Sequence, residues 1–487
     1  MKNRAVILFT LCAVAVVGTG LASVAQGAYL TVYGSPAYDA NTNDGFKMFD
    51  ASGVNDSGTA VGWGAKYVGG VDKGHRAVRW DGSGAAATEL GNLGTDSGGN
   101  TFVEVDALNA SGTAVGWAYK YVGGVYVGDR AVQWNAGSTT AIELSNLGTD
   151  SNGFTEVHAS AINDAGTVVG YARKFFGGSG TRAVRWKASN AAAVELGDLG
   201  TDSNGYTRAQ ASPLASAINA PGTAVGWAYK YVGGIYRGGR AVRWDASGTT
   251  ATELGNLGTD SNGYAWVQAD LINASGVIVG SASKYNGDID LSYRTVRWDA
   301  GSTVATELDN LGTDSNGSTL TWARGINATG TIVGGAYKYV GGVYMGARAV
   351  RWDASGTAAT ELGNLGTDSN GYTWAAAGAM NASGIAVGAA DKYVDGNHIG
   401  QRAVYWGLDG LAVDLNTLID PNSGWTLMDA ETISNTGWVA GWGLYDPDGA
   451  GGADAYERLF LVQIPEPASA TLLLTGVLSA LLKRRRR

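Results

Sequence analysis

A repeated arginine and a repeated glutamate are the charged residues whose spacing most clearly suggests a defined interaction. The arginine opens an Arg-Ala-Val-Arg-Trp segment at Arg76, Arg130, Arg182, Arg240, Arg294, Arg348, Arg402 and, in degenerate form, Arg458. The glutamate recurs at Glu89, Glu143, Glu195, Glu253, Glu307 and Glu361. An arginine fork can hold a carboxylate through two parallel hydrogen bonds. Because an enzyme needs one site and a repeated fold needs the same brace in every unit, we predict that these pairs are structural.

Lysine and tyrosine gather in a glycine-rich segment that precedes this arginine. The tyrosines flank a Val-Gly-Gly or similar tip as Tyr121 and Tyr126, Tyr231 and Tyr236, and Tyr339 and Tyr344. Loops carry much of the binding function of proteins, so we predict that these residues bind a glycan or a matrix polymer. The alternative is a set of glycine-rich hairpins whose tyrosines cover the sheet edge. The tryptophan that ends each Arg-Ala-Val-Arg-Trp segment has a similar choice between sugar stacking and packing between units.

One unrepeated stretch, residues 446–454, is the best candidate for a calcium loop. It places Asp446, Asp448 and Asp454 in a glycine-rich segment. Calcium prefers six to eight oxygen ligands, but this stretch lacks the spacing and the glutamate of an EF-hand. The repeated Thr-Asp-Ser-Asn-Gly segments offer too few oxygens each, so we predict a turn role for them. No other cofactor is expected.

Residues for catalysis are sparse. His75, His158 and His398 occupy non-equivalent places, and neither His-Glu-x-x-His nor Gly-x-Ser-x-Gly occurs. Asp288 and Asp290 could pair as glycosidase carboxylates, although loop variation is by far the commoner cause of such acids. We therefore expect a chain that is not an enzyme, with a structural, adhesive or glycan-binding role.

The alternative function is a propeller hydrolase or lyase that acts on extracellular polysaccharide. Such an enzyme should carry a convergent polar cluster in one unit that the other units lack. The deviations from the repeat are instead scattered among Ser212–Ser216, Asp288–Tyr293 and Asn397–Gln401.

All these residues belong to one internal repeat. The asparagine of the segment Ile-Asn-Ala-Ser-Gly-Thr recurs, with some substitution around it, at Asn55, Asn109, Asn163, Asn219, Asn273, Asn327, Asn381 and Asn435. The spacing is 54 residues, with one of 56. Eight such units account for nearly all of residues 28–463, and no linker interrupts them.

Each unit is expected to form four short strands. In Glu253–Trp298 the strands are predicted at Glu253–Leu257, Tyr264–Ile272, Val277–Tyr285 and Arg294–Trp298, separated by Asn-Gly and Asn-Ala-Ser-Gly turns. Eight such units predict an all-β, eight-bladed β-propeller of about 54-residue repeats. An orphan strand, Tyr29–Tyr33, should pair with Arg458–Val462 and close the last blade. An open β-solenoid with capped ends is the alternative.

The two ends differ from the repeats and resemble targeting signals. Residues 1–27 combine a basic start, a short apolar helix that includes Cys12, and small residues before Ala28, as in a secretory signal peptide. Residues 464–487 hold Pro465, Glu466 and Pro467, a second short apolar helix over Ala468–Leu482, Lys483, and Arg484, Arg485, Arg486 and Arg487. This order predicts a membrane segment with a cationic stop on the cytoplasmic side.

The C-terminal segment resembles the PEP-CTERM sorting signal of Gram-negative bacteria. That resemblance implies recognition by an exosortase and the secretion machinery, transient membrane anchoring, and delivery to the cell surface or the exopolysaccharide matrix. The repeats resemble the extracellular HAF family through Ile162–Gly170, although Arg182-Ala183-Val184 stands where His-Ala-Phe is usual. This second resemblance implies a secreted repeat protein and brings no catalytic residues with it.

Composition excludes several classes of protein. With 76 glycines, 7 prolines and a single cysteine, the chain is neither collagen-like nor a disulfide scaffold. Its net charge is −9, and removal of both ends would leave 27 basic against 42 acidic residues, a net charge of about −15. A nucleic-acid partner is therefore not expected, whereas exopolysaccharide is.

Overall fold

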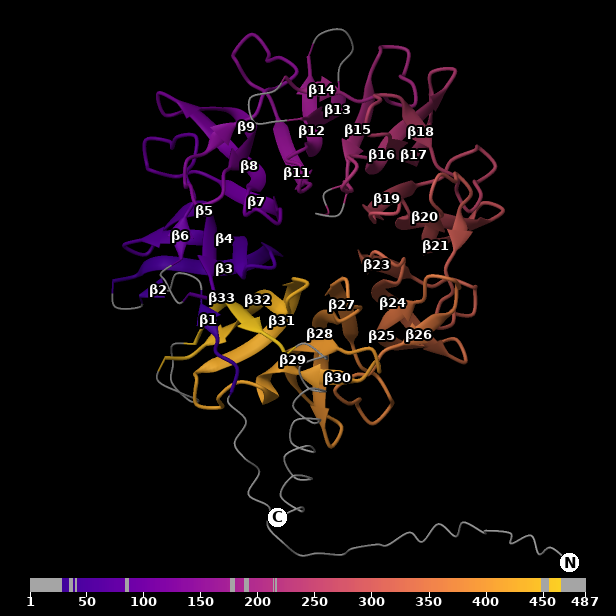
Figure 1. Ribbon diagram of the computed structural model, residues 1–487. Coiled ribbons are helices and arrows are strands. Elements are labelled where there is room, and N and C mark those ends of the chain that lie inside the picture. The colour runs from indigo at the N-terminus through magenta and orange to yellow at the C-terminus, as the bar shows by residue number, and fades with distance from the viewer. Residues whose placement is uncertain are drawn as a thin grey trace, which may run out of the picture.

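The chain folds into eight antiparallel blades around a central axis (Figure 1). The computed structural model describes residues 29–34, 38–39, 42–83, 87–175, 180–187, 192–212, 214, 217–447 and 455–465. Within each blade the strands pair in chain order from the axis outward, and two parallel residue pairs between the third and fourth blades join those two into one sheet. The prediction of an all-β, eight-bladed propeller is confirmed.

The strands fall into four concentric sets. The inner strands are β3 (Asp44–Val54), β7 (Val103–Leu108), β11 (Val157–Ile162), β15 (Thr207–Ala211), β19 (Val267–Ile272), β23 (Thr321–Ile326), β27 (Ala375–Met380) and β31 (Trp425–Ile433). The second strands are β4 (Thr59–Val68), β8 (Ala114–Val122), β12 (Val168–Lys174), β16 (Ala224–Val232), β20 (Ile278–Asn286), β24 (Ile332–Val340), β28 (Ala386–Val394) and β32 (Trp438–Tyr445).

The third strands are β5 (Val71–Asp81), β9 (Val125–Trp134), β13 (Gly180–Trp186), β17 (Ile235–Trp244), β21 (Ile289–Trp298), β25 (Val343–Trp352), β29 (Asn397–Trp406) and β33 (Tyr456–Gln463). The outer strands are β6 (Thr88–Glu89), β10 (Ile142–Glu143), β14 (Val194–Glu195), β18 (Ala251–Glu253), β22 (Thr306–Glu307), β26 (Ala359–Glu361), β30 (Ala412–Asp414) and β1 (Tyr33–Gly34). The short strand β2 (Tyr38–Asp39) pairs with β3, and a single 3₁₀ turn, η1 (Leu415–Thr417), follows β30.

The order of strands within a repeat differs from the prediction. The Glu-Leu strand does not begin a unit; Glu253 on β18 pairs with Val242 on β17 and forms the outer edge of the preceding blade. The segment predicted as a glycine–tyrosine loop is also strand, because the second and third strands run on to a two-residue turn. Gly123 and Gly124 form that turn between β8 and β9 with φ of 60° and 82°, values that glycine adopts without steric cost.

The ring closes through its two ends, as predicted. In the antiparallel pair of β1 and β33, Tyr33 lies opposite Leu461 and Gly34 opposite Phe460, so the N-terminal strand supplies the outer strand of the last blade beside the yellow C-terminal strand (Figure 1). On the inner side, the Asn435 N–H donates to Asp56 Oδ1 of the first blade at 2.7 Å. Closure removes the free sheet edges that an open solenoid would expose.

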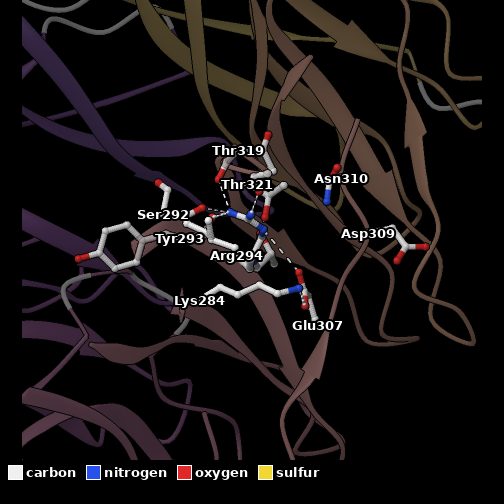
Figure 2. A network of polar contacts seen from close by, with 12 residues as sticks. Lys284, Ser292, Tyr293, Arg294, Glu307, Asp309, Asn310, Thr319 and Thr321 are labelled. Atoms are coloured by element: carbon white, nitrogen blue, oxygen red, sulfur yellow. Dashed lines mark hydrogen bonds and ion pairs between the residues drawn. The ribbon is translucent and has the colours of Figure 1, made fainter. Parts of the chain in front are cut away.

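The predicted arginine–glutamate brace forms, and a lysine completes it. In the fifth blade Lys284 Nζ lies 2.7 Å from Glu307 Oε2, and Arg294 Nε lies 3.5 Å from Glu307 Oε1 (Figure 2). The Arg294 guanidinium also donates to the Thr319 carbonyl at the start of the next blade. The same lysine, glutamate and arginine meet in five other blades. The brace therefore ties three strands of one blade to its neighbour.

The tryptophans that end the third strands fill the space between blades. Trp134, Trp186, Trp244, Trp298 and Trp352 are all fully buried. Trp298 packs against Leu254 of the preceding blade and Val267 of its own, and its Nε1 donates to the Gly255 carbonyl at 3.1 Å. These indoles have no face left for a sugar.

The repeated asparagines form a chain of amide contacts from blade to blade. Asn273 Oδ1 accepts the Val277 N–H at 2.9 Å, and its Nδ2 donates to the Asn327 carbonyl of the next blade at 3.1 Å. The assignment of Asn435 to this series is wrong: the Asn381 amide donates to the Ser434 carbonyl, and Ser434 occupies the equivalent turn position. One fewer residue separates the last two turns than the sequence spacing implies.

The substitution Asn273→Ala should destabilise the ring. It leaves the Asn327 carbonyl and the Val277 N–H without their side-chain partners in a buried position, at a cost of about 1–3 kcal/mol. Urea unfolding followed by tryptophan fluorescence measures the effect. The control Ser275→Ala removes only a hydroxyl that donates to Asn273 Oδ1 and should cost less; equal losses would show that the amide contact between blades contributes nothing of its own.

Candidate active site

A bulge in the inner strand creates one special position in each blade. Pairing between the inner and second strands skips one residue at the same place in seven blades. A bulged residue is released from the ladder and can be re-aimed. The residues at this position are Ser52, Asp106, Ser160, Asp270, Arg324, Gly378 and Glu431.

These residues lie on the wall of the central channel. In β7 the residues on either side of the bulge, Val105 and Ala107, are 1% exposed because they pack between blades, whereas Asp106 is only half-buried. Arg324 is exposed although neighbouring blades contact its strand on both sides. The space open to it is the channel, so the bulge position sets the chemistry of the channel wall.

Three carboxyl groups meet where the ring closes. Asp429 and Glu431 come from β31 of the last blade, and Asp50 comes from β3 of the first. Glu431 Oε2 accepts the Ala51 N–H across the closure at 2.6 Å, which brings the Glu431 carboxyl group close to that of Asp50. Glu431 is half-buried and Asp50 is exposed. Two acids from opposite ends of the chain are thus neighbours that differ in exposure.

Burial raises the pKa values of two acids in this cluster above those of ordinary carboxyl groups. Burial first, and then the contact with Asp50, raises the pKa of Glu431 well above its usual value. Burial and the Asp50 charge raise the pKa of Asp429 to about 6. Desolvation favours the protonated form of a carboxyl group, and Glu431 is the less exposed of the two neighbours. The cluster therefore combines a half-buried acid that holds its proton more strongly than usual with an exposed carboxyl.

Other titratable residues on the channel wall lie apart from this three-carboxyl cluster. Burial raises the pKa of Asp270 to about 7, against the opposing effect of Arg324 from the next blade. Burial and the charge of Glu104 raise the pKa of Asp106 well above its usual value. The channel wall therefore has acids at blades 8, 1, 2 and 5 and an exposed guanidinium at blade 6.

One mouth of the channel is lined by both polar and aliphatic residues. A cavity of about 470 Å³ opens there between the asparagine turns and a collar of aliphatic residues. Val54, Leu108, Ile162, Ile218, Ile272, Met380 and Ile433 form the collar. The chain also leaves the ring at this mouth, because the Ile464 N–H donates to Gly437 in the turn of the last blade.

The predicted binding tyrosines lie at the other face, on the long hairpins. Tyr121 and Tyr126 lie opposite each other with ring centroids 5.8 Å apart, and Tyr126 also contacts Phe154 of the next blade. Tyr231 and Tyr236, and Tyr339 and Tyr344, repeat the pair at 5.7 and 5.5 Å. Each pair stays in its own blade, so the fold spaces them around the face instead of converging them.

Other predicted site residues have structural partners or lie outside the described residues. Asp288 Oδ1 accepts the Ser261 N–H at 2.7 Å and Asp290 Oδ1 that of Ser292 at 2.8 Å, so both hold turns. Of the predicted calcium ligands only Asp446 is described; Asp448 and Asp454 are not. Within the described ranges no group of three or more His, Cys, Asp or Glu side chains is arranged to hold a metal.

Both predicted targeting helices fall outside the described residues, as do Glu466, Pro467 and the four C-terminal arginines. Among the residues that are described, no helix has the length and apolar character needed to span a bilayer.

Sequence reasoning missed the carboxyl cluster. Asp50, Asp429 and Glu431 were not predicted, because the sequence predictions rested on the hairpin segments and on the residues that every repeat shares. A usable signal exists three residues before each turn asparagine, where Ser52, Asp106, Ser160, Asp270, Arg324 and Gly378 differ while their neighbours stay small or aliphatic.

Comparison with known proteins adds little at the level of sequence. No family model matches the chain, and no curated protein does. Among solved structures, it is similar to a puromycin hydrolase mutant (15% identity, TM-score 0.42), covering 84% of this chain but only 60% of the hydrolase. It is also similar to the β-propeller domain of the Trilobed protease from Pyrococcus furiosus (10% identity, TM-score 0.39), covering 76% and 96% of the two chains.

A third similar structure is the xyloglucanase from Xanthomonas campestris, with 9% identity, a TM-score of 0.40, and coverage of 88% of this chain and 67% of the xyloglucanase. Structures named as enzymes thus stand among those that resemble this chain, which contradicts our expectation that it is not an enzyme. That expectation is withdrawn. At these identities the likeness concerns the fold alone and assigns no reaction.

The raised pKa of Asp270 predicts a pH-dependent cost to stability. Its pKa is about 7 in the fold and about 4 in an unfolded chain. The native state therefore holds the proton longer, and stability falls as pH rises from about 4 to 7. Asp270→Asn should be more stable than the parent at pH 8 by about 1–4 kcal/mol and should lose this advantage at pH 4.

Urea unfolding at the two pH values tests this. Asp299→Asn, at a turn residue whose side chain is 66% exposed, is the control and should show no gain that depends on pH. A constant difference between Asp270→Asn and the parent at both pH values would contradict a buried, protonated Asp270.

Proposed function

We propose that this protein is a hydrolase of extracellular polysaccharide that uses the carboxyl cluster at the closure of the ring. The observation that carries the proposal is the position of half-buried Glu431, held by the Ala51 N–H at 2.6 Å, beside the exposed carboxyl group of Asp50. Hydrolysis of a glycosidic bond needs one carboxyl group that holds a proton and a second that does not. The difference in burial between these residues supplies that division.

In the proposed reaction Glu431 is the general acid. It gives its proton to the glycosidic oxygen as the bond to the sugar breaks. A second carboxyl group, that of Asp50 or Asp429, either activates the water that attacks the sugar or forms a covalent glycosyl intermediate that water then hydrolyses. The Ala51 N–H at 2.6 Å fixes the orientation of the Glu431 carboxyl group.

Hydrolysis fits the cluster better than a lyase reaction does. Elimination needs a base strong enough to remove a carbon-bound proton, and the groups that meet here are carboxyl groups. Carboxyl pairs with separated pKa values are instead suited to acid–base hydrolysis.

An extracellular setting belongs to the same proposal. The signal-like residues 1–27 and the PEP-CTERM-like residues 464–487 support export across the inner membrane, handling by an exosortase, and residence at the surface or in the matrix of a Gram-negative cell. A polymer outside the cell is the substrate that such an enzyme would meet. The paired tyrosines of the hairpins, each about 38% exposed at Tyr126, Tyr236 and Tyr344, would offer stacking surfaces along the polymer.

Glu431→Gln should abolish turnover. Loss of a general acid costs about 10²–10⁴-fold in rate, and the amide keeps the size of the side chain. Release of reducing ends from the exopolysaccharide of the source cells, and from a panel of neutral and acidic polysaccharides, measures the effect. Asp50→Asn should act similarly, and the parent rate should fall as pH rises through the raised pKa of Glu431.

Asp106→Asn is the matched control, because it changes a half-buried acid at the same bulge position in another blade and should leave turnover unchanged. No turnover of any polysaccharide by the parent chain, or equal loss in the control and in Glu431→Gln, would overturn the proposal.

The triple substitution of Tyr121, Tyr231 and Tyr339 by Ala should weaken retention on insoluble polysaccharide by about 1–3 kcal/mol per stacked sugar. Turnover of short soluble fragments should not change. Co-sedimentation with the polymer measures retention, and unchanged co-sedimentation would show that these tyrosines serve only to cover the sheets.

A further inference from the structure

Blade 6 reverses an arrangement that is shared by several other blades. In four other blades the inner strand carries a polar residue opposite a tryptophan of the second strand: Asp50 and Trp63, Glu104 and Trp117, Gln210 and Trp227, Asp429 and Trp442. In blade 6 the inner strand carries Trp322 opposite Gly335. A Cβ on Gly335 would lie 2.1 Å from the indole, so the glycine is what admits the tryptophan. The exchange moves the tryptophan onto the inner strand, from which its half-buried indole lies over Gly335 and 6.0 Å from the ring of Tyr337 on the second strand.

Arg324 follows Trp322 at the bulge position of the same strand. It is exposed, and within the described part of the chain its guanidinium has no ion pair within 4.0 Å and no hydrogen bond. This differs from the brace arginines, which are buried and donate to carboxylates and backbone carbonyls. The charge of Arg324 acts on Asp270 of the preceding blade, with which it forms no ion pair within 4.0 Å. An arginine on the wall of an enclosed channel, with its fork unused, is suited to a carboxylate brought by a ligand.

Blade 7 lies between Arg324 on blade 6 and the carboxyl cluster on blade 8, and it has only small residues at the two wall positions. Its residues at the two wall positions are Ala376 and Gly378, and Ala376 lies opposite Ala389. Going around the channel, an aromatic surface and a guanidinium on blade 6 are thus followed by a low wall on blade 7 and by Asp429 and Glu431 on blade 8. No other three consecutive blades show this order at these positions.

We infer that Trp322 and Arg324 form a subsite for a uronate residue, so that the polymer taken into the channel is an acidic polysaccharide. The sugar ring stacks on the indole, and its carboxylate accepts the two parallel hydrogen bonds of the guanidinium. The next part of the chain crosses the low wall of blade 7 and brings a glycosidic bond to Glu431. The path of the polysaccharide from this subsite to Glu431 rests on the proposed function. Binding of a uronate at the subsite does not require cleavage.

Binding of defined oligosaccharides to the full chain tests the subsite. Tetragalacturonate, its fully methyl-esterified form, and tetrasaccharides of alginate and of heparosan are titrated into the Glu431→Gln protein by calorimetry. Asp50→Asn is the second background in case the first fails to fold. We expect at least one of the acidic probes to bind, and Arg324→Gln to weaken that binding about tenfold or more.

Further variants separate charge from stacking. Arg324→Lys should recover part of the loss, because it restores the charge without the fork. Trp322→Ala should weaken the acidic probe as well, and if tetragalacturonate is the probe that binds, its methyl ester should bind about tenfold more weakly. Arg173→Gln, at an exposed arginine that pairs with Glu156 on the outer part of a blade, is the matched control and should leave binding unchanged.

The outcomes distinguish this inference from the proposed hydrolysis. No binding of any acidic probe, equal binding of tetragalacturonate and its methyl ester, or binding that Arg324→Gln does not change would overturn the uronate subsite. If the parent chain nevertheless cleaves a neutral polysaccharide and Glu431→Gln does not, the hydrolysis stands without the subsite. Binding that depends on Arg324, with no cleavage of any polymer, would support the subsite and overturn the hydrolysis.

Discussion

Each blade must bury both of its faces, and only neighbouring blades can cover them. Trp298 and its equivalents fill the gap on the outer side, and residues such as Val105 and Ala107 fill it near the axis. A four-stranded sheet of this size cannot be stable with both faces in water. The repeat therefore has to continue until it meets its own beginning, and the pairing of β1 with β33 is where that requirement is met.

The same requirement decides where the sequence is free to vary. Inner-strand residues that face a neighbouring blade are mostly small or aliphatic, and Gly325 shows how little room there is: a Cβ there would lie 3.0 Å from the Met380 nitrogen of the next blade. The bulged residue is exempt, because it leaves the ladder and meets the channel. Serine, aspartate, arginine, glycine and glutamate all occur there. A uniform scaffold thus offers one position per blade where chemistry can differ without loss of packing.

The sequence predicted the architecture well because the architecture is repeated. The 54-residue spacing, the asparagine turns, the arginine–glutamate brace and the closure by Tyr29–Tyr33 all follow from patterns that occur many times. The errors arose where one copy departs from the pattern, as at Ser434, or where a strand belongs to the blade before it, as at Glu253. The carboxyl cluster was out of reach for a related reason. Ala51 and Glu431 are 380 positions apart, and only closure of the ring makes them neighbours.

Closure and the carboxyl cluster are therefore one feature of the molecule. Glu431 is buried because the first blade covers it, and its carboxylate oxygen is oriented by an N–H that the first blade provides. In an open chain the same glutamate would be solvated and would titrate as an ordinary acid. The energy that raises its pKa comes from the packing that holds the first and last blades together. A site built at this junction is consequently complete only in the closed ring, which explains why the most perturbed acids of the molecule include those at the one interface that the repeat does not make by simple succession.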